Sequence, residues 1–143
     1  MLGHTHILIQ QQTDEICVST PDQNRLRALV GASERMRQLY GLIQAVAPTP
    51  ATVLITGESG AGKEQAARTL HELSGRRGPL VVLDASVADP EMIRSDLFGH
   101  IRGAFTGASG PREGAFRRAQ HGTLFIDETD LPQQHPKRWA VTA

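Results

Sequence analysis

Between residues 52 and 64, an aliphatic run passes through three glycines into a lysine. Val53–Ile55 predicts a short strand covered on both faces, as in a parallel sheet. The glycines let the backbone curl until successive N–H groups point into one hollow. Lys63 begins a helical pattern, and the positive end of that helix faces the same hollow. The stretch therefore predicts a loop that binds phosphate.

The spacing of this loop matches the nucleotide-binding pattern at every place except the last. There the pattern has Ser or Thr, whose hydroxyl ligates magnesium, and this chain has Glu64. A nucleoside triphosphate is the expected ligand. The residues expected to contact it are Gly57, Glu58, Ser59, Gly60, Ala61, Gly62, Lys63 and Glu64. The alternative is a glycine-rich turn between a strand and a helix, with a solvated lysine.

Length and composition narrow the class of protein. A chain of 143 residues can bury one sizeable core but not two. Its 15 basic and 15 acidic side chains balance, so composition favours neither nucleic acid nor a membrane surface. The single cysteine, Cys17, excludes an internal disulfide, and we expect it to be a small apolar side chain on a strand. Lacking an apolar run of membrane-spanning length and a signal peptide, the protein is expected to be cytoplasmic.

Periodicity predicts alternating helices and strands from about Leu29 onward. Ser33 is expected to cap a helix that reaches Val46 and ends before Pro48. The other expected elements are a helix from Lys63 to about Ser74, a strand at 80–83, a helix at 91–97, a helical turn at 114–119 and a strand at 123–126. This alternation is typical of an α/β fold with a parallel sheet.

Two apolar stretches, 6–9 and 15–18, predict a hairpin ahead of this unit. A linker from Ser19 to Arg27 follows, so we divide the chain into residues 1–28 and 29–143. His4 and His6 would share one strand face, but no third metal ligand is evident.

The strand at 123–126 ends in two acids, Asp127 and Glu128. Parallel strands bring their carboxyl ends to one edge of the sheet, so we expect the acids beside the phosphate loop. Asp127 is expected to hold magnesium, and Glu128 to orient and deprotonate the attacking water. The alternative is a solvated strand end.

Residues 99–107 form a glycine-rich stretch that carries Phe105 without periodic apolar neighbours. An exposed apolar residue on such a loop can mark contact with a partner. The residues alone leave open whether Phe105 contacts a partner or turns back into the core.

Two motifs together resemble a known family. Gly-Ala-Phe-Thr-Gly-Ala at 103–108, preceded by Leu-Phe-Gly-His at 97–100, accompanies the phosphate loop at 57–64. This combination resembles the central AAA+ domain of the bacterial enhancer-binding proteins that activate sigma-54 RNA polymerase. The likeness runs from Leu29 to about Pro132, and the family also carries Glu at the place of Glu64. Further matching pieces are Val30–Ser33, Ala47-Pro48, Leu70-His71, Gly114–Phe116 and Gly122–Glu128.

The resemblance implies a P-loop NTPase fold, an AAA+ three-layer sandwich. It implies an ATPase that uses ATP and Mg²⁺, self-associates into a ring and remodels the closed promoter complex of sigma-54 RNA polymerase. It places Val30 and Gly31 near the adenine. The residues it implies for contact with sigma-54 are Gly103, Ala104, Phe105, Thr106, Gly107 and Ala108, with Phe105 and Thr106 as the contact pair.

Some positions depart from the family pattern. Asp84 stands where many members have an asparagine that holds the catalytic glutamate, so control of Glu128 by this position is open. His121 and Thr129 also differ from the usual residues around the acidic strand. The 6–18 hairpin resembles the closing strands of a forkhead-associated domain, which precedes this module in some relatives.

Family members continue beyond the length of this chain with two more strands, arginine fingers, sensors, a helical lid and usually a DNA-binding domain. We therefore expect a sandwich that is incomplete at its C-terminus, with a gap between the strands at 53–55 and 124–126. Residues 138–143 are not expected to fill that gap, because the connection from Glu128 is short for a helical crossover. A shortened gene, a frameshift near Gln133 or a deliberate cut would each give such a chain.

Three hypotheses remain open on function. The chain is an ATPase module that is competent only in a longer chain or an assembly, a module that binds ATP and sigma-54 without turnover, or a fragment without a stable fold. The second is favoured, because the resemblance assigns the arginines that act in trans to a part that this sequence lacks. Contact with DNA would need a further domain, and no membrane partner is expected.

Overall fold

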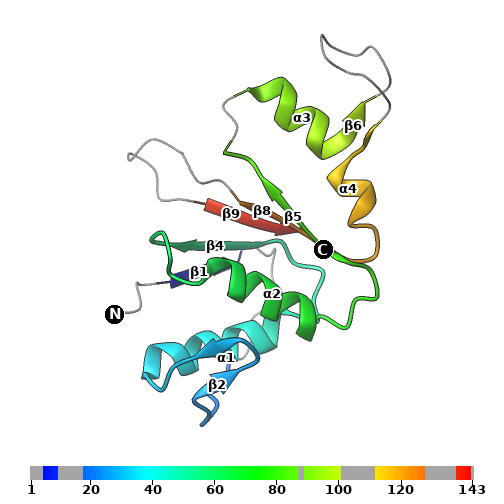
Figure 1. Ribbon diagram of the computed structural model, residues 1–143. Coiled ribbons are helices and arrows are strands. Elements are labelled where there is room, and N and C mark those ends of the chain that lie inside the picture. The colour runs from blue at the N-terminus through cyan, green and yellow to red at the C-terminus, as the bar shows by residue number, and fades with distance from the viewer. Residues whose placement is uncertain (1–4, 10–17, 87–88, 101–111, 128–137, 143) are drawn as a thin grey trace.

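The computed structural model describes residues 5–9, 18–86, 89–100, 112–127 and 138–142, and its elements are shown in Figure 1. A five-stranded sheet has the order β1–β4–β9–β8–β5. Its strands are β1 (Thr5–Ile9), β4 (Val53–Gly57), β9 (Arg138–Thr142), β8 (Thr123–Asp127) and β5 (Leu80–Asp84). Two small ribbons pair β2 (Arg25–Leu26) with β3 (Leu29–Val30) and β6 (Gly99–His100) with β7 (Arg112–Glu113). The helices are α1 (Glu34–Val46), α2 (Lys63–Leu73), α3 (Pro90–Phe98) and α4 (Ala115–Arg118).

The helices form at the expected places because their ends are capped and their apolar residues recur at helical spacing. The hydroxyl of Ser33 accepts a hydrogen bond from the N–H of Met36 at 3.3 Å and starts α1. Asp89 caps α3 in the same way, with Pro90 in the first helical position. None of the described helices is long and apolar enough to cross a lipid bilayer.

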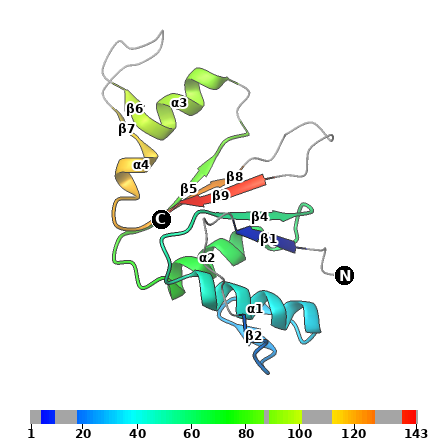
Figure 2. The same cartoon turned by 180° about the vertical axis from the view of Figure 1, so that it is seen from behind.

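The helices cover both faces of the sheet, as Figures 1 and 2 show from opposite sides. Helices α1 and α2 pack over β4, whereas α3 and α4 lie over β5 and β8. Successive side chains of β8 point to opposite faces of the sheet and so belong to different cores. Phe125 packs in the core under α1 and α2, and Leu124 packs in the core under α4. The first core consists mainly of Leu39, Tyr40, Ile43, Val46, Val53, Ile55, Ala66, Ala67, Leu70 and Phe125.

The sheet is mixed, so the predicted parallel arrangement does not extend to all of its strands. Strand β9 runs antiparallel to both of its neighbours, β4 and β8, and β5 is parallel to β8. The three strands predicted from the sequence, β4, β5 and β8, therefore still point the same way. The strand expected at 80–83 forms as β5, but it is an edge strand that is only partly buried, with Val82 45% exposed.

The predicted gap between β4 and β8 is filled by β9, which corrects the expectation for residues 138–142. Leu54 pairs with Ala140 on one side of β9, and Ile126 pairs with the same residue on the other. A parallel strand in this place would need a crossover, but an antiparallel strand returns from the edge at which β8 ends. The short connection is therefore no obstacle.

The strand predicted at the N-terminus forms, but its described neighbour is β4, with Ile7 opposite Ile55. Of its expected hairpin partner, 15–18, only Val18 is described, and it lies outside any strand. Part of the expected linker forms the β2–β3 ribbon, which places Leu26 and Leu29 in the core under α1 and α2. The division after residue 28 therefore does not coincide with a break in the packing.

Candidate phosphate-binding site

The loop after β4 has the backbone that its glycines predict. Gly60 and Gly62 have φ angles of +80° and +86°, in the left-handed region that glycine favours. Between them, the N–H of Ala61 donates to the carbonyl of Glu58 at 3.1 Å. The chain thus turns tightly from β4 into α2, with Gly62 as the N-cap residue of that helix.

Lys63 lies inside the curve of this loop. Its side chain is 9% exposed, and its Nζ donates to the carbonyl oxygens of Gly57 at 3.0 Å and Glu58 at 2.6 Å. A buried ammonium group is costly unless its donors are paired, and here backbone oxygens at the mouth of the loop pair them. Because Gly62 has no side chain, no cap residue accepts from the first N–H groups of α2, which are suited to an anion.

The side chain of Glu64 points along the outside of α2. Its carboxylate forms an ion pair with Arg68 at 3.2 Å, one helical turn later, and both side chains are about half exposed. Glu58, Ser59 and Gly60 are also exposed. The loop therefore offers backbone N–H groups and Lys63 rather than acidic side chains to a ligand.

Asp127 is the last residue of β8. It lies at the carboxyl ends of the strands, which is the edge of the sheet where the phosphate loop follows β4. Leu54 of β4 and Ile126 of β8 both pair with the same residue of β9. The residues that follow them, Ile55 and Asp127, therefore lie at the same height along the two strands. Two strand spacings separate those positions, a distance of about 10 Å. Since side chains alternate along a strand, Asp127 lies on the same face as Phe125, the face that α2 covers. Lys63 and Asp127 therefore occupy the same edge and the same face.

A second acid lies beside Asp127. Asp84 pairs with it in the parallel register of β5 and β8, and the N–H of Ala85 donates to the Asp127 carbonyl at 2.6 Å. Hydrogen bonds with the side chain and the backbone of Ser86 lower the pKa of the exposed Asp84 carboxyl. This edge of the sheet therefore carries a fixed negative charge beside the end of β8.

A sequence profile described as the Sigma-54 interaction domain matches residues 29–137, more than half of the chain. The chain belongs to the sigma-54 interaction domain family. It is 43% identical over 126 residues to the putative uric acid sigma-54-dependent transcriptional regulator UacR of Escherichia coli K12, covering 86% of this chain and 21% of that protein. It is 54% identical over 101 residues to the transcriptional regulatory protein ZraR of Klebsiella oxytoca, covering 70% and 23%.

A third relative is the DNA-binding transcriptional regulator NtrC of Azospirillum brasilense, 46% identical over 112 residues, with 77% of this chain and 23% of that protein covered. The chain thus spans less than a quarter of the length of these three proteins. With the phosphate loop and the strand–helix alternation, the match identifies the AAA+ P-loop domain of the enhancer-binding activators.

Two sets of residues expected to act in this sigma-54 interaction domain lie outside the described part of the chain. They are the predicted catalytic residue Glu128 and the predicted contact residues 103–108. The described chain reaches His100 before that second set and resumes at Arg112 after it, where the two residues pair across the β6–β7 ribbon. Their roles remain predictions.

Val30 and Gly31, expected near the adenine, lie on the α2 side of the sheet, since β3 packs against α2. Val30 is 59% exposed. The carbonyl of Gly31 accepts from the Tyr40 hydroxyl at 3.1 Å, and a Cβ at Gly31 would lie 2.7 Å from Met36 Cγ. Only glycine fits this backbone position without displacing Met36.

A polar contact that sequence reasoning missed joins the far end of α2 to the start of β8. Nδ1 of His71 lies 2.9 Å from Oγ1 of Thr123, which is fully buried. Burial, and then the nearby Arg76 charge, lower the pKa of His71, and Glu72 opposes them. In the sequence, Leu70-His71 stands out only as a piece of the family pattern. The residues around it do not indicate that His71 contacts a residue 52 positions away.

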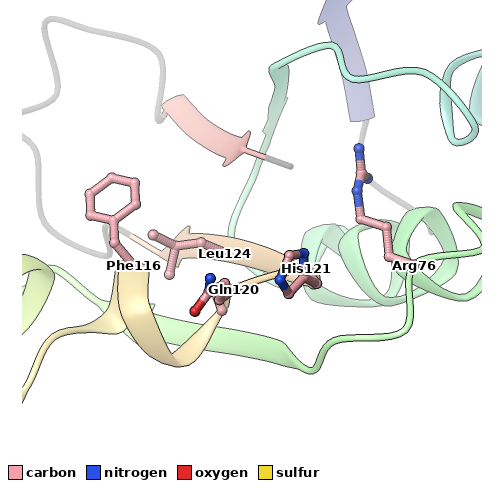
Figure 3. A pocket seen from close by; sticks show the side chains of 7 residues that line it. Arg76, Phe116, Gln120, His121 and Leu124 are labelled. Atoms are coloured by element: carbon pink, nitrogen blue, oxygen red, sulfur yellow. The ribbon is translucent and has the colours of Figure 1, made fainter.

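A cavity of about 470 Å³ lies at the opposite end of β8 from Asp127 (Figure 3). Its lining residues are Arg76, Phe116, Ala119, Gln120, His121, Gly122 and Leu124. The guanidinium of Arg76 donates to the carbonyl of Thr49 at 3.0 Å, which holds it at one side. Because the phosphate loop is at the other edge of the sheet, this cavity is separate from the candidate phosphate site.

Proposed function

We propose that this chain is the nucleotide-binding part of a sigma-54-dependent transcriptional activator. It binds ATP with Mg²⁺, and ATP hydrolysis is coupled to remodelling of sigma-54 RNA polymerase. The observation that carries this proposal is the shared position of Lys63 and Asp127, at one edge and on one face of the sheet. The regulatory role is supported by the relatives UacR, ZraR and NtrC, each of which is named as a transcriptional regulator.

The loop supplies the groups that a triphosphate requires. Backbone N–H groups of residues 57–64 would bind the phosphate oxygens, and the first turn of α2 adds its positive end. The Lys63 ammonium now donates to the carbonyls of Gly57 and Glu58, and those two hydrogen bonds would be exchanged for phosphate oxygens. Binding therefore replaces one set of acceptors with another and leaves no buried donor unpaired.

The residues at this edge also fit magnesium. Among the residues that the structure describes, no three His, Cys, Asp or Glu side chains gather closely enough to hold a metal ion by themselves. Magnesium typically takes one or two carboxylates together with phosphate oxygens and water, so Asp127 with a bound nucleotide would complete its ligands. The ion would neutralise charge on the phosphates, and Asp127 would orient it.

Hydrolysis would need a base for the attacking water, and Glu128, the next residue, is proposed for this role. We also propose contact with sigma-54 through Gly103–Ala108, and self-association into a ring. The domain is proposed to be an AAA+ three-layer sandwich. Residues 1–28 are proposed to be an N-terminal hairpin and linker, related to the end of a forkhead-associated domain.

A second candidate function is nucleotide binding without turnover. It is favoured by β9, because this antiparallel strand fills the place that the family resemblance gives to a strand reached by a helical crossover. A third candidate, a fragment without a stable fold, is disfavoured by the two buried cores on opposite faces of the sheet.

The experiment measures phosphate release from ATP over a range of protein concentrations, together with thermal unfolding with and without magnesium ATP. An ATPase that assembles gains specific activity as concentration rises. A binding module shows a higher unfolding temperature with nucleotide but no phosphate release above that of a Lys63→Ala control. A chain with no cooperative unfolding transition in either condition contradicts both.

A further inference from the structure

The hydrogen bond between His71 and Thr123 lies at one end of two elements whose other ends form the candidate phosphate site. Lys63 precedes His71 by two turns of α2, a rise of roughly 12 Å along the helix. Asp127 ends the strand that Thr123 begins, a rise of roughly 13 Å along β8. Helix and strand therefore span nearly the same distance from this contact to the candidate site.

The strand side of the contact is held firmly. The N–H of Thr123 donates to the carbonyl of Pro79 at 2.9 Å, and Leu80 lies opposite Thr123 in the parallel register of β5 and β8. A Cβ at Gly122 would overlap the carbonyl oxygen of Pro79, so glycine lets the two segments come this close. The hydroxyl of Thr123 is thus a buried partner in a fixed position for His71.

Apolar packing alone does not fix where α2 lies along β8. Phe125 of β8 shares a core with Ala66 and Leu70 of α2. Such contacts hold the helix close to the strand, but they have no preferred direction. A hydrogen bond has a narrow range of lengths and angles, so the contact of His71 with Thr123 restrains the helix against sliding or tilting.

The proposed magnesium site needs that restraint. Magnesium requires a near-ideal octahedral arrangement of ligands, and here they would come from Asp127 and from phosphates bound beside Lys63. A tilt of about 5° at the contact moves the other end of α2 by about 1 Å, over an arm of roughly 12 Å. A shift of that size is enough to lose a metal ligand. The phosphate loop itself stays intact, because its residues are consecutive in the chain.

We infer that His71 and Thr123 are positioning residues for the magnesium–ATP complex, because their hydrogen bond sets the distance between the phosphate loop and Asp127. Both residues lie at the far ends of α2 and β8, so neither would contact the ligand. The inference rests on the proposed function, since it takes ATP and the ion to be bound between Lys63 and Asp127. Binding of ATP without the ion depends on the loop alone. The contact therefore acts on the part of the affinity that magnesium adds.

The test compares ATP affinity in Mg²⁺ and in EDTA, by calorimetric titration into the 143-residue chain. Thr123→Val keeps the shape of the side chain but removes the hydroxyl, and His71→Ala removes the other partner. The Mg²⁺ gain is the ratio of the ATP dissociation constant in EDTA to that in Mg²⁺. Each variant is expected to reduce this gain roughly tenfold, as for groups that orient a metal ligand without binding the metal. ATP affinity in EDTA is expected to stay within about twofold of the unmodified chain.

Two control variants separate positioning from a general loss of stability. Thr123→Ser keeps the hydroxyl and is expected to keep the Mg²⁺ gain. Ile43→Val removes a methyl group from the same buried core, on α1, and lowers the unfolding temperature without changing either partner of the contact. Thermal unfolding is measured on every variant, so that affinities are compared among folded chains. If Thr123→Val does not fold, His71→Ala, at a partly exposed position, decides the test.

An unchanged Mg²⁺ gain in Thr123→Val and His71→Ala overturns the inference. So does an equal loss of ATP affinity in EDTA and in Mg²⁺, or a loss of the gain in Ile43→Val, since each is the result expected of a contact that only stabilises the fold. If the unmodified chain does not bind ATP, or gains no affinity from Mg²⁺, the proposed function fails and the inference fails with it. If Asp127→Asn loses the gain and Thr123→Val does not, only the inference fails.

Discussion

Nδ1 of His71 lies 2.9 Å from Oγ1 of Thr123, so the last turn of α2 is joined to the first residue of β8. Lys63 is at the opposite end of α2, and Asp127 is at the opposite end of β8. One polar contact at the amino end of β8 therefore aligns α2 with β8. At their other ends, these two elements carry the residues proposed to bind phosphate and magnesium.

Replacing His71 with Ala leaves the fully buried Thr123 hydroxyl without this partner. The free energy of unfolding is expected to fall by about 1–2 kcal/mol, the usual result of orphaning a buried polar group. Urea denaturation of His71→Ala, Thr123→Val and the double variant measures it. The double variant is expected to lose less than the sum of the two single variants, with Gln120→Ala, on the exposed turn before β8, as a near-neutral control. Additive losses would show that the two residues are not coupled.

Stability is expected to fall as the pH is lowered through the titration of His71. Burial, followed by the Arg76 charge, lowers its pKa in the folded chain, while Glu72 acts against them, so folding favours the neutral ring. A lowered folded pKa gives a contribution that is fully present above the unfolded pKa, about 6.5, and is lost as the pH falls below it. Urea midpoints between pH 8 and pH 5.5 measure the slope. A His71→Gln variant is expected to flatten it, and an equal slope in both chains would contradict the assignment to His71.

Gly62→Ala is expected to destabilise the chain by about 1 kcal/mol, because φ is +86° and an L residue is strained there although the space around it is open. Gly114→Ala has no such φ angle but would overlap backbone atoms of Leu97, Phe98 and Gly99, so a larger loss is expected. Chemical denaturation ranks the two variants. A larger loss of stability for Gly62→Ala than for Gly114→Ala would mean that the α3–α4 junction accommodates an added methyl group more easily than the phosphate loop does.

A chain that ends at residue 137 is expected to lose most of its cooperative unfolding. Without β9, the facing edges of β4 and β8 lose the ladder that now pairs them, and buried backbone groups become unpaired. Far-ultraviolet circular dichroism during thermal unfolding measures the loss. A shortened chain as stable as the full one would show that β9 does not contribute to the sheet.

Local patterns in the sequence predict the elements of this fold better than their partners. Glycine spacing and the apolar period identify the phosphate loop, α1 and α2, because those signals lie within one or two turns of chain. The pairing of β9 between β4 and β8 carries no local signal. A crossover is needed only by a parallel strand, and the direction of Arg138–Thr142 is decided by its neighbours in the folded sheet.

At the candidate site too, residues within a local motif are predictable from the sequence, whereas contacts between distant elements are not. Lys63 and Asp127 are predictable, since each follows a strand and belongs to a spaced motif. The hydrogen bond of His71 to Thr123 and the stacking of Phe98 on Phe116 join residues from different elements, so no single stretch of sequence contains them. The antiparallel pairing of β1 with β4 escapes prediction for the same reason, because alternation predicts a strand but not its neighbour.

The most direct test of the account is calorimetric titration of ATP into the unmodified chain, Lys63→Ala and Asp127→Asn, each with and without Mg²⁺. We expect the unmodified chain to bind ATP more tightly with Mg²⁺, and Lys63→Ala to lose roughly tenfold or more of the ATP affinity in both conditions. Asp127→Asn is expected to match the unmodified chain without Mg²⁺ and to lose the gain that Mg²⁺ brings. Failure of the unmodified chain to bind ATP, or an Asp127→Asn variant that keeps the full magnesium effect, would contradict a shared site for Lys63 and Asp127.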